Sequence, residues 1–120
     1  DAGPIPPFLR ALHSLEALFM SNCNLTGAIP QWMSELSCLR QLDLQHNQLR
    51  GSFPPNVGHL RSLLYLNLKD NPGIGGPLPV RELCLLQKLN RLSIVNTGVQ
   101  VGEAQVQELA RFLPRCKVWL

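Results

Sequence analysis

The sequence predicts an α/β solenoid, in which a short strand and a return segment repeat along the chain as successive coils. Three observations predict it. The motif Gly-x-apolar-Pro recurs at 24-residue spacing in Gly3–Pro6, Gly27–Pro30 and Gly51–Pro54. Leucines recur ahead of this motif as Leu-x-x-Leu-x-Leu, and apolar residues recur every three positions after it. Such self-similarity, at a period of roughly 20 to 50 residues, is typical of solenoids.

A strand is predicted at the start of each unit, in the run Leu-x-x-Leu-x-Leu or its equivalent. The run begins at Leu15, Leu39, Leu63 and Leu89. Because side chains alternate along a strand, the leucines face inward and the residues between them face outward. We expect successive strands to stack in parallel and to bury their leucines against the neighbouring coils.

The residues after each strand predict how the coil turns. Asn47 and Asn71 lie where the chain leaves the strand, and their amides can bond the backbone of adjacent coils. Gly27, Gly51 and Gly76 allow a tight turn that a Cβ would obstruct. The proline that follows fixes φ, and the three-residue apolar period after it predicts a 3-10 or irregular helical return on the convex side.

Two aromatic residues occupy equivalent places in these returns. Phe8 follows Pro6 by two residues, and Trp32 follows Pro30 by two. We expect both aromatic side chains to pack on the convex side rather than to bind a ligand.

The unit boundaries follow from the motifs. One domain covers the chain, with a partial first unit at 1–14, repeats at about 15–38, 39–62, 63–88 and 89–101, and a C-terminal cap at 102–120. The third repeat has one extra residue between Asn71 and Gly76, and the fourth lacks the Gly-x-Ile-Pro part. Because the chain opens within a unit, we expect either a piece of a longer array or a domain whose N-terminal part is not included.

The C-terminal end predicts a capping helix and a last strand. One face of a helix over residues 103–113 carries four apolar residues, Val106, Leu109, Ala110 and Leu113. Pro114 ends this helix, and apolar residues then alternate over residues 116–120 as in a strand. An end coil needs such a cover over its apolar face.

The combined pattern LxxLxLxxNxLxGxIPxxLxxLxxL resembles the leucine-rich repeat in its 24-residue plant-type form, over roughly residues 3–101. That form is familiar from plant receptor kinases, receptor-like proteins and polygalacturonase-inhibiting proteins, and it occurs in other eukaryotes and bacteria. The resemblance implies a right-handed superhelix with short parallel strands on its concave face. It also implies a receptor-like module that binds a protein or peptide and lies outside the cell or at its surface.

The predicted concave face supplies the candidate binding residues. Its outward positions mix polar side chains with two aromatic ones, which suits recognition of a protein or peptide ligand. The candidates are Phe19, Ser21, Gln41, Asp43, Gln45, His46, Tyr65, Asn67, Lys69, Asp70, Arg91 and Ser93. We expect His46 and Asp70 to form a surface pair across two rungs. We expect no enzyme, because a flat open strip excludes no water and offers a nucleophile no pocket.

Composition argues against several other classes. Apolar residues make up 45% of the chain and charged residues 16%, which predicts a packed domain rather than disorder. A net charge of +3 without a Lys/Arg run gives no reason to expect nucleic acid as a partner. No apolar run reaches the roughly 18 residues of a membrane span. No cofactor or metal is expected, because the cysteines form no CxxC pair and lie near no histidine cluster.

Cysteines and one sequon bear on the compartment. We expect the four cysteines to be buried as small apolar residues rather than joined in disulfides. Asn24-Leu25-Thr26 is a sequon, so Asn24 is a candidate glycosylation site in a secreted protein. The alternative function is an intracellular structural or scaffold subunit of a larger assembly, which free cysteines would favour.

Overall fold

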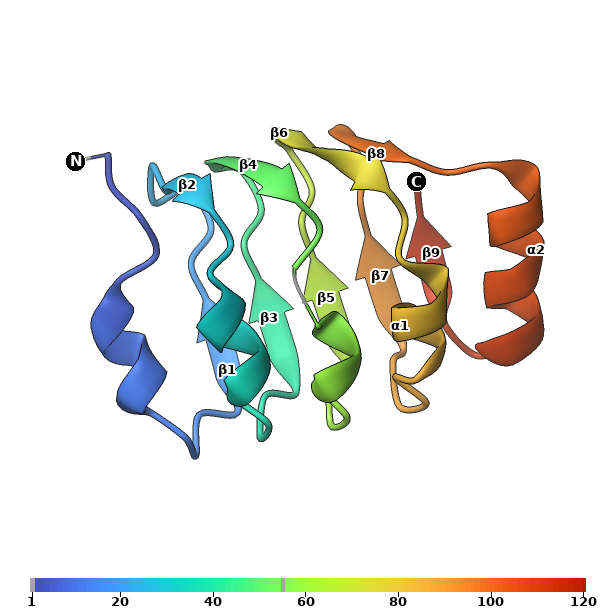
Figure 1. Ribbon diagram of the computed structural model, residues 1–120, viewed down its shortest axis with the longest axis horizontal. Coiled ribbons are helices and arrows are strands. Elements are labelled where there is room, and N and C mark those ends of the chain that lie inside the picture. The colour runs from blue at the N-terminus through green and yellow to red at the C-terminus, as the bar shows by residue number, and fades with distance from the viewer. Residues whose placement is uncertain (1, 55) are drawn as a thin grey trace.

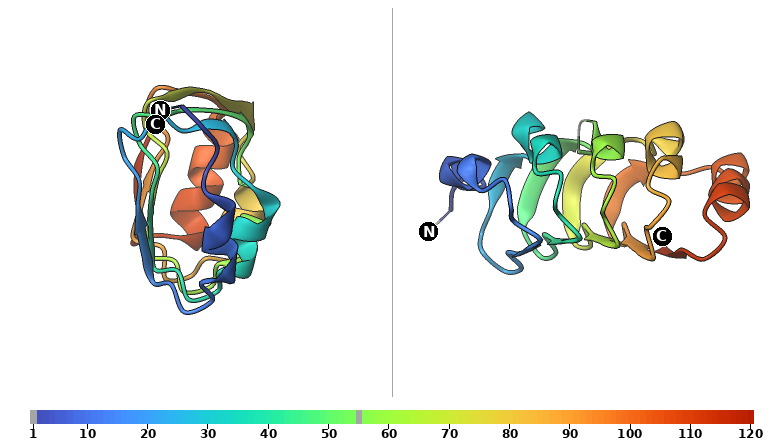
Figure 2. Two further views of the ribbon diagram at one scale, coloured as in Figure 1. Left: turned by 90° about the vertical axis from the view of Figure 1, so that its left-hand side faces the viewer. Right: turned by 90° about the horizontal axis from the view of Figure 1, so that it is seen from below.

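The computed structural model describes residues 2–54 and 56–120, which form a curved solenoid (Figures 1 and 2). Asp1, the expected start of the first unit, lies outside the described residues. In chain order the elements are η1 (Pro7–Ala11), β1 (Ala17–Phe19), β2 (Thr26–Ala28), η2 (Gln31–Glu35), β3 (Gln41–Asp43), β4 (Gln48–Ser52), η3 (Val57–His59), β5 (Tyr65–Asn67), β6 (Asn71–Pro77), α1 (Val80–Cys84), β7 (Arg91–Ser93), β8 (Thr97–Gln100), α2 (Glu103–Phe112) and β9 (Lys117–Trp119).

The strands predicted from the leucine runs form the concave sheet. Its order is β1-β3-β5-β7-β9, and every neighbouring pair is parallel. Leu42, Leu66 and Leu92 lie in one register across it and are fully buried. The predicted parallel stacking of coils around a leucine core is therefore confirmed.

A second parallel sheet, in the order β2-β4-β6-β8, follows the asparagine positions and was not predicted. The turn glycines do lie within it in the left-handed region, with φ of +75° at Gly27, +89° at Gly51 and +81° at Gly76. Stacked coils bring these segments alongside one another, so their backbone groups pair as strands do. The extra residue of the third repeat is absorbed by a bulge between Asn71 and Gly75.

Helices cover the convex side, and the predicted 3-10 turns occur in η1, η2 and η3. The return after Pro79 is instead α-helical, which corrects the expectation of a 3-10 or irregular segment there. Met33 N donates to Pro30 O three residues back, whereas Leu83 N donates to Pro79 O four residues back. Three residues separate Pro79 from the buried Leu83, whereas two separate Pro30 from the buried Met33, and the additional residue converts the tight turn into an α-turn.

Buried asparagines tie the coils together, as predicted. Asn47 Oδ1 accepts hydrogen bonds from the N–H groups of Cys23 and Leu25, both at 3.0 Å. Its Nδ2 donates to Met20 O at 2.8 Å. Asn71 occupies the same position one coil later and bonds the coil of Asn47 in the same way. These side chains satisfy backbone groups that the core would otherwise leave unpaired.

Two expectations about burial are wrong. Trp32 is half-buried against the core, but Phe8 is 71% exposed. Phe8 lies on η1, the first convex helix, so no preceding described coil covers it. Cys23 and Cys38 are exposed and only Cys84 and Cys116 are half-buried; the thiols of all four are free.

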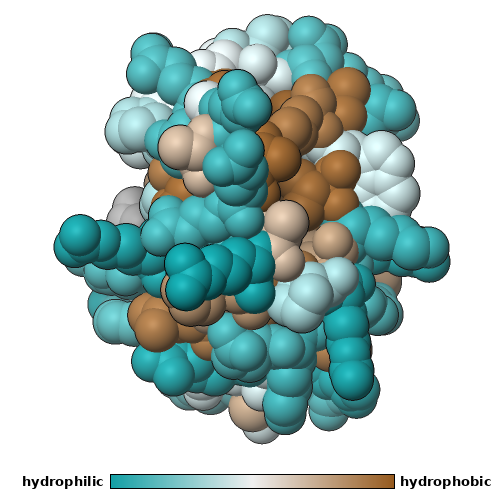
Figure 3. Space-filling view, turned by 90° about the vertical axis from the view of Figure 1, so that its right-hand side faces the viewer, coloured by the Kyte–Doolittle hydropathy of each residue, from teal (hydrophilic) through white to brown (hydrophobic). Residues whose placement is uncertain are grey.

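The C-terminal segment forms the predicted helix and strand. Leu109 and Leu113 are buried against the last coil, and β9 pairs with β7 at the edge of the concave sheet. An apolar stripe remains visible on the outer side of this end (Figure 3). Within the described ranges, no helix is both long and apolar enough to cross a membrane.

Candidate functional site

Strand register arranges the outward side chains of the concave sheet in rows that cross the strands. The first row is Ala17, Gln41, Tyr65, Arg91 and Lys117. The second row is Phe19, Asp43, Asn67, Ser93 and Trp119. The structure therefore brings the candidate residues of the strands together on one face. Lys117 and Trp119 extend both rows and were missed as candidates, although the alternation over residues 116–120 could have identified them.

Three candidates of the second row, Asp43, Asn67 and Ser93, are buried rather than free for a ligand. Asp43 accepts hydrogen bonds from the backbone N–H and the side-chain Nε2 of Gln45, at 3.2 and 3.1 Å. Asn67 accepts one from Lys69 N at 3.0 Å and donates one to the Tyr65 hydroxyl at 2.8 Å. Side chains on adjacent positions thus cover this row, and its polar groups orient Gln45 and Tyr65.

A shallow depression of about 480 Å³ lies over the first and second rows. It is lined by Phe19, Gln41, Asp43, Leu64, Tyr65, Asn90 and Arg91. Phe19 is 59% exposed, and Tyr65 is half-buried with its hydroxyl held by Asn67. Arg91 is exposed, and its guanidinium has no carboxylate partner in the part of the chain that the structure describes. Apolar rings and a cation therefore line the same hollow.

Two cations are neighbours at the C-terminal end of the first row. Arg91 and Lys117 are register partners on β7 and β9, and both side chains are exposed. Like charges on adjacent positions of paired strands repel each other. No acidic side chain among residues 2–54 and 56–120 forms an ion pair with either. An anionic group placed over this end of the row would relieve the repulsion.

The candidates beyond the strand ends form two further rows. Ser21 is exposed, while Gln45 and Lys69 are half-buried. His46 and Asp70 lie in the left-handed region, with φ of +57° and +60°.

The predicted pair of His46 and Asp70 is confirmed. His46 Nδ1 lies 2.7 Å from Asp70 Oδ2, and Asn96 Nδ2 donates to Asp70 Oδ1 at 2.9 Å. Asn96 was not among the candidates, but it occupies the equivalent position one coil after Asp70. His46 and Asp70 are both partly exposed, and each turn repeats the same backbone geometry. The contact joins successive turns along the surface, so we interpret it as a structural cross-link.

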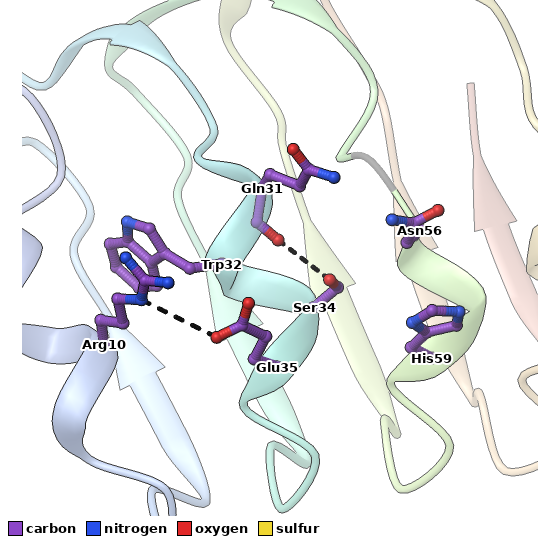
Figure 4. Close-up of a pocket in the computed structure, with 7 residues that line it drawn as sticks. All are labelled: Arg10, Gln31, Trp32, Ser34, Glu35, Asn56 and His59. Atoms are coloured by element: carbon purple, nitrogen blue, oxygen red, sulfur yellow. Dashed lines mark hydrogen bonds and ion pairs between the residues drawn. The ribbon is translucent and has the colours of Figure 1, made fainter.

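A second depression, of about 460 Å³, lies on the convex side across η1, η2 and η3. It is lined by Arg10, Gln31, Trp32, Ser34, Glu35, Asn56 and His59, shown in Figure 4. Arg10 Nε lies 3.8 Å from Glu35 Oε1, and Ser34 Oγ donates to Gln31 O at 2.9 Å. Some polar groups that line this depression thus form an ion pair or a hydrogen bond with one another. Within the described residues, no three His, Cys, Asp or Glu side chains come together as a metal site.

Comparison with known proteins agrees with the solenoid fold. A family model of the leucine rich repeat matches residues 6–49. The LRR ectodomain of the receptor kinase SOBIR1 from Arabidopsis thaliana matches 97% of this chain at 27% identity, with a TM-score of 0.80. A chain of the BIR3–SERK2 complex from Arabidopsis thaliana matches 98% at 36% identity, with a TM-score of 0.81. The plant peptide hormone receptor RGFR1, in complex with RGF2, matches 98% at 28% identity, with a TM-score of 0.83.

These solved structures are longer than the present chain. The match covers 60% of the SOBIR1 ectodomain, 61% of the chain from the BIR3–SERK2 complex and 18% of RGFR1. No curated protein sequence matches the chain.

Proposed function

Because the chain is a leucine-rich repeat protein with repeats of the plant type, we propose that it is a non-enzymatic recognition module that binds a protein or peptide along its concave face. The observation that carries this proposal is the hollow over the first and second rows. Phe19 and Tyr65 present aromatic surface there, while the leucines behind them complete the core. An aromatic anchor beside adaptable polar groups is typical of interfaces that bind protein.

The side chains of the hollow indicate what the partner presents to it. An apolar or aromatic side chain of the partner would fill the space between Phe19 and Tyr65. A carboxylate would pair with Arg91, where a bidentate contact gives both energy and orientation. We therefore expect the partner segment to run across the strands and to carry an apolar residue and an acidic residue near each other.

The proposed location is outside the cell or at its surface, within a receptor-like protein. Its support is the set of similar structures, which includes receptor ectodomains of plants. Asn24 adds to this support because it belongs to a sequon and is exposed, so a glycan there would project into solvent.

Panning a random dodecapeptide phage library against the chain tests the binding proposal. We expect enriched peptides to combine an aromatic or aliphatic residue with Asp or Glu. Their affinity should fall at least about tenfold for the Phe19→Ala/Tyr65→Ala variant, since loss of such anchors costs 1.4 kcal/mol or more. Phe8→Ala is the matched control, because it removes a still more exposed ring from the convex side. Equal affinity for the double variant with unchanged circular dichroism would place the site elsewhere.

A different measurement separates this proposal from an intracellular scaffold. Free thiols in the structure are compatible with either compartment. Intact mass of the protein from its native source, before and after glycosidase treatment, reports a glycan on Asn24, and thiol titration reports the cysteines. An unglycosylated protein with four free thiols would contradict the extracellular location and leave the scaffold role.

A further inference from the structure

The hollow on the convex side has no part in the concave binding face, and most of the side chains that line it can form hydrogen bonds (Figure 4). Its volume of about 460 Å³ is typical of sites that bind small molecules. Arg10 of η1 lies at one end, side chains of η2 form the middle, and Asn56 and His59 lie at the other end. Three successive coils therefore contribute to one surface.

The hollow exists because one coil has a short side chain where the preceding coil has a long one. Arg10 follows Pro6 by four residues, and Ser34 follows Pro30 by four. Arg10 reaches the next coil, where its Nε lies 3.8 Å from Glu35 Oε1. Ser34 is short and buried, and its hydroxyl donates within η2 at 2.9 Å. No side chain at this position therefore spans from η2 to η3, and the space over Ser34 stays open.

Three side chains of the lining have no hydrogen-bonding role in the fold. Within residues 2–54 and 56–120, the side chains of Gln31, Asn56 and His59 are exposed and form no hydrogen bond or ion pair with another residue. Asn56 precedes η3 at a φ of +56°, and its amide makes no capping bond to that helix. Two amides and an imidazole thus offer both donors and acceptors to a ligand.

The charges and the aromatic ring of the lining narrow the class of ligand. Its two fixed charges, on Arg10 and Glu35, are opposite in sign and pair with each other, so the lining favours neither an anion nor a cation. Trp32 adds a flat apolar surface beside Arg10 (Figure 4). Part of this ring packs against the core, so its position is fixed before a ligand arrives. A neutral ligand with both C–H surface and hydroxyl groups matches these features.

We propose that this hollow binds a neutral oligosaccharide, independently of the concave site. A sugar ring presents C–H groups on its faces, and these are attracted to the negative face of an aromatic ring such as that of Trp32. Its hydroxyls each donate and accept, so they pair with the amides of Gln31 and Asn56 and with the His59 imidazole. Packed helices lie roughly 8–10 Å apart, which exceeds one sugar ring, so a ligand that reaches from η2 to η3 has at least two rings.

Tryptophan fluorescence tests the proposal, because the chain has only two tryptophans. In a Trp119→Phe variant only Trp32 remains, so the tryptophan emission reports on this hollow alone. Cellotetraose, maltotetraose and mannotetraose are the probes. At least one of them should change the emission in a saturable way, with a Kd of about 1 mM or lower, as suits a shallow site.

Two glycine substitutions form a matched pair for locating the site. Asn56→Gly removes a hydrogen-bonding side chain and leaves the positive φ unstrained. The Kd should rise about three- to tenfold, since about one net hydrogen bond is lost. Asn22→Gly makes the same change at a φ of +54°, at an exposed residue that does not line the hollow, and should leave the Kd unchanged.

The concave variant separates this proposal from the proposed function. Phe19→Ala/Tyr65→Ala removes the aromatic side chains of the concave hollow and should leave the affinity for the tetraose unchanged. Either site can therefore fail its test while the other passes.

Saturation-transfer difference NMR reads the same contact from the ligand. The C–H protons on one face of a sugar ring should receive the strongest transfer, because they lie against Trp32. The absence of a saturable change with all three tetraoses up to about 20 mM would overturn the proposal. So would an affinity that Asn56→Gly leaves unchanged, or a capped tetraalanine peptide that binds the hollow as tightly as the tetraoses.

Discussion

The side-chain Nδ2 of Asn71 lies 2.8 Å from the backbone oxygen of Leu44, in the coil before its own. The same nitrogen donates to Leu68 O at 3.0 Å, and Asn71 Oδ1 accepts from Leu49 N at 3.1 Å. Asn71 is completely buried. One amide therefore supplies partners for three backbone groups in two coils, where water has no access.

Replacing this amide by an apolar group of similar size should destabilise the fold strongly. Asn71→Leu leaves the three backbone groups without partners, and we expect a loss of about 3 kcal/mol in the free energy of unfolding. Urea denaturation followed by circular dichroism measures it. Asn90→Leu, at an exposed position, should change that free energy by no more than about 0.5 kcal/mol. Equal effects of the two substitutions would show that the asparagine bridge does not stabilise the stack.

Sequence alone predicted this bridge because every coil repeats the same geometry. Once the spacing of Asn47 and Asn71 placed both in one solenoid position, their bonding to the adjacent coil followed. The second sheet did not follow, since its strands contain glycines and show no alternation. Their pairing arises only when stacked coils bring Gly51 and Ile74 side by side.

The sequence likewise predicted part of the candidate site. Alternation identified the face, and the spacing of His46 and Asp70 identified their contact. Alternation could not show that Asp43 and Asn67 would be buried. Their exposure depends on the conformations of the Gln45 and Tyr65 side chains, which form hydrogen bonds with them. These hydrogen bonds join residues two positions apart in one repeat, and they depend on side-chain rotamers that the hydrophobic pattern does not specify.

A side chain at the turn glycine Gly76 should destabilise the fold because of the backbone conformation there, and not because of a steric clash. A Cβ on Gly76 would meet no atom within 4 Å, but φ is +81° there. We expect Gly76→Ala to lower the melting temperature in calorimetry, at a cost of about 1 kcal/mol. Gly3→Ala is the matched control, with equal space and no positive φ, and should be close to neutral. A neutral Gly76→Ala would mean that the turn adjusts without strain.

Trp32 and Phe8 occupy equivalent sequence positions but should contribute differently to the free energy of unfolding. Trp32 packs against the core, and Phe8 is largely exposed. We expect Trp32→Ala to cost about 2 kcal/mol of unfolding free energy, from lost apolar burial, and Phe8→Ala less than about 0.5 kcal/mol. Guanidinium denaturation of the two variants compares them directly. A larger effect at Phe8 would indicate that η1 is covered in solution.

The four thiols should react with an alkylating reagent at different rates, because two of them are half-buried and two are exposed. Burial raises the pKa of Cys116 to about 11, and burial with the nearby carboxylate of Glu108 raises that of Cys84. The thiolate is the nucleophile. Iodoacetamide at pH 8, followed by peptide mass spectrometry, should therefore modify the exposed Cys23 and Cys38 first.

The raised pKa of Cys116 also fixes the direction of a pH effect on stability. The folded state holds this proton up to about pH 11, whereas the unfolded chain releases it near 9.0. The group therefore leaves stability unchanged below pH 9 and lowers it as the pH rises from 9 toward 11. Urea midpoints across this range should fall more steeply for the wild type than for Cys116→Ala, which has no thiol to ionise. Parallel slopes for the two proteins would contradict a raised pKa of this half-buried thiol.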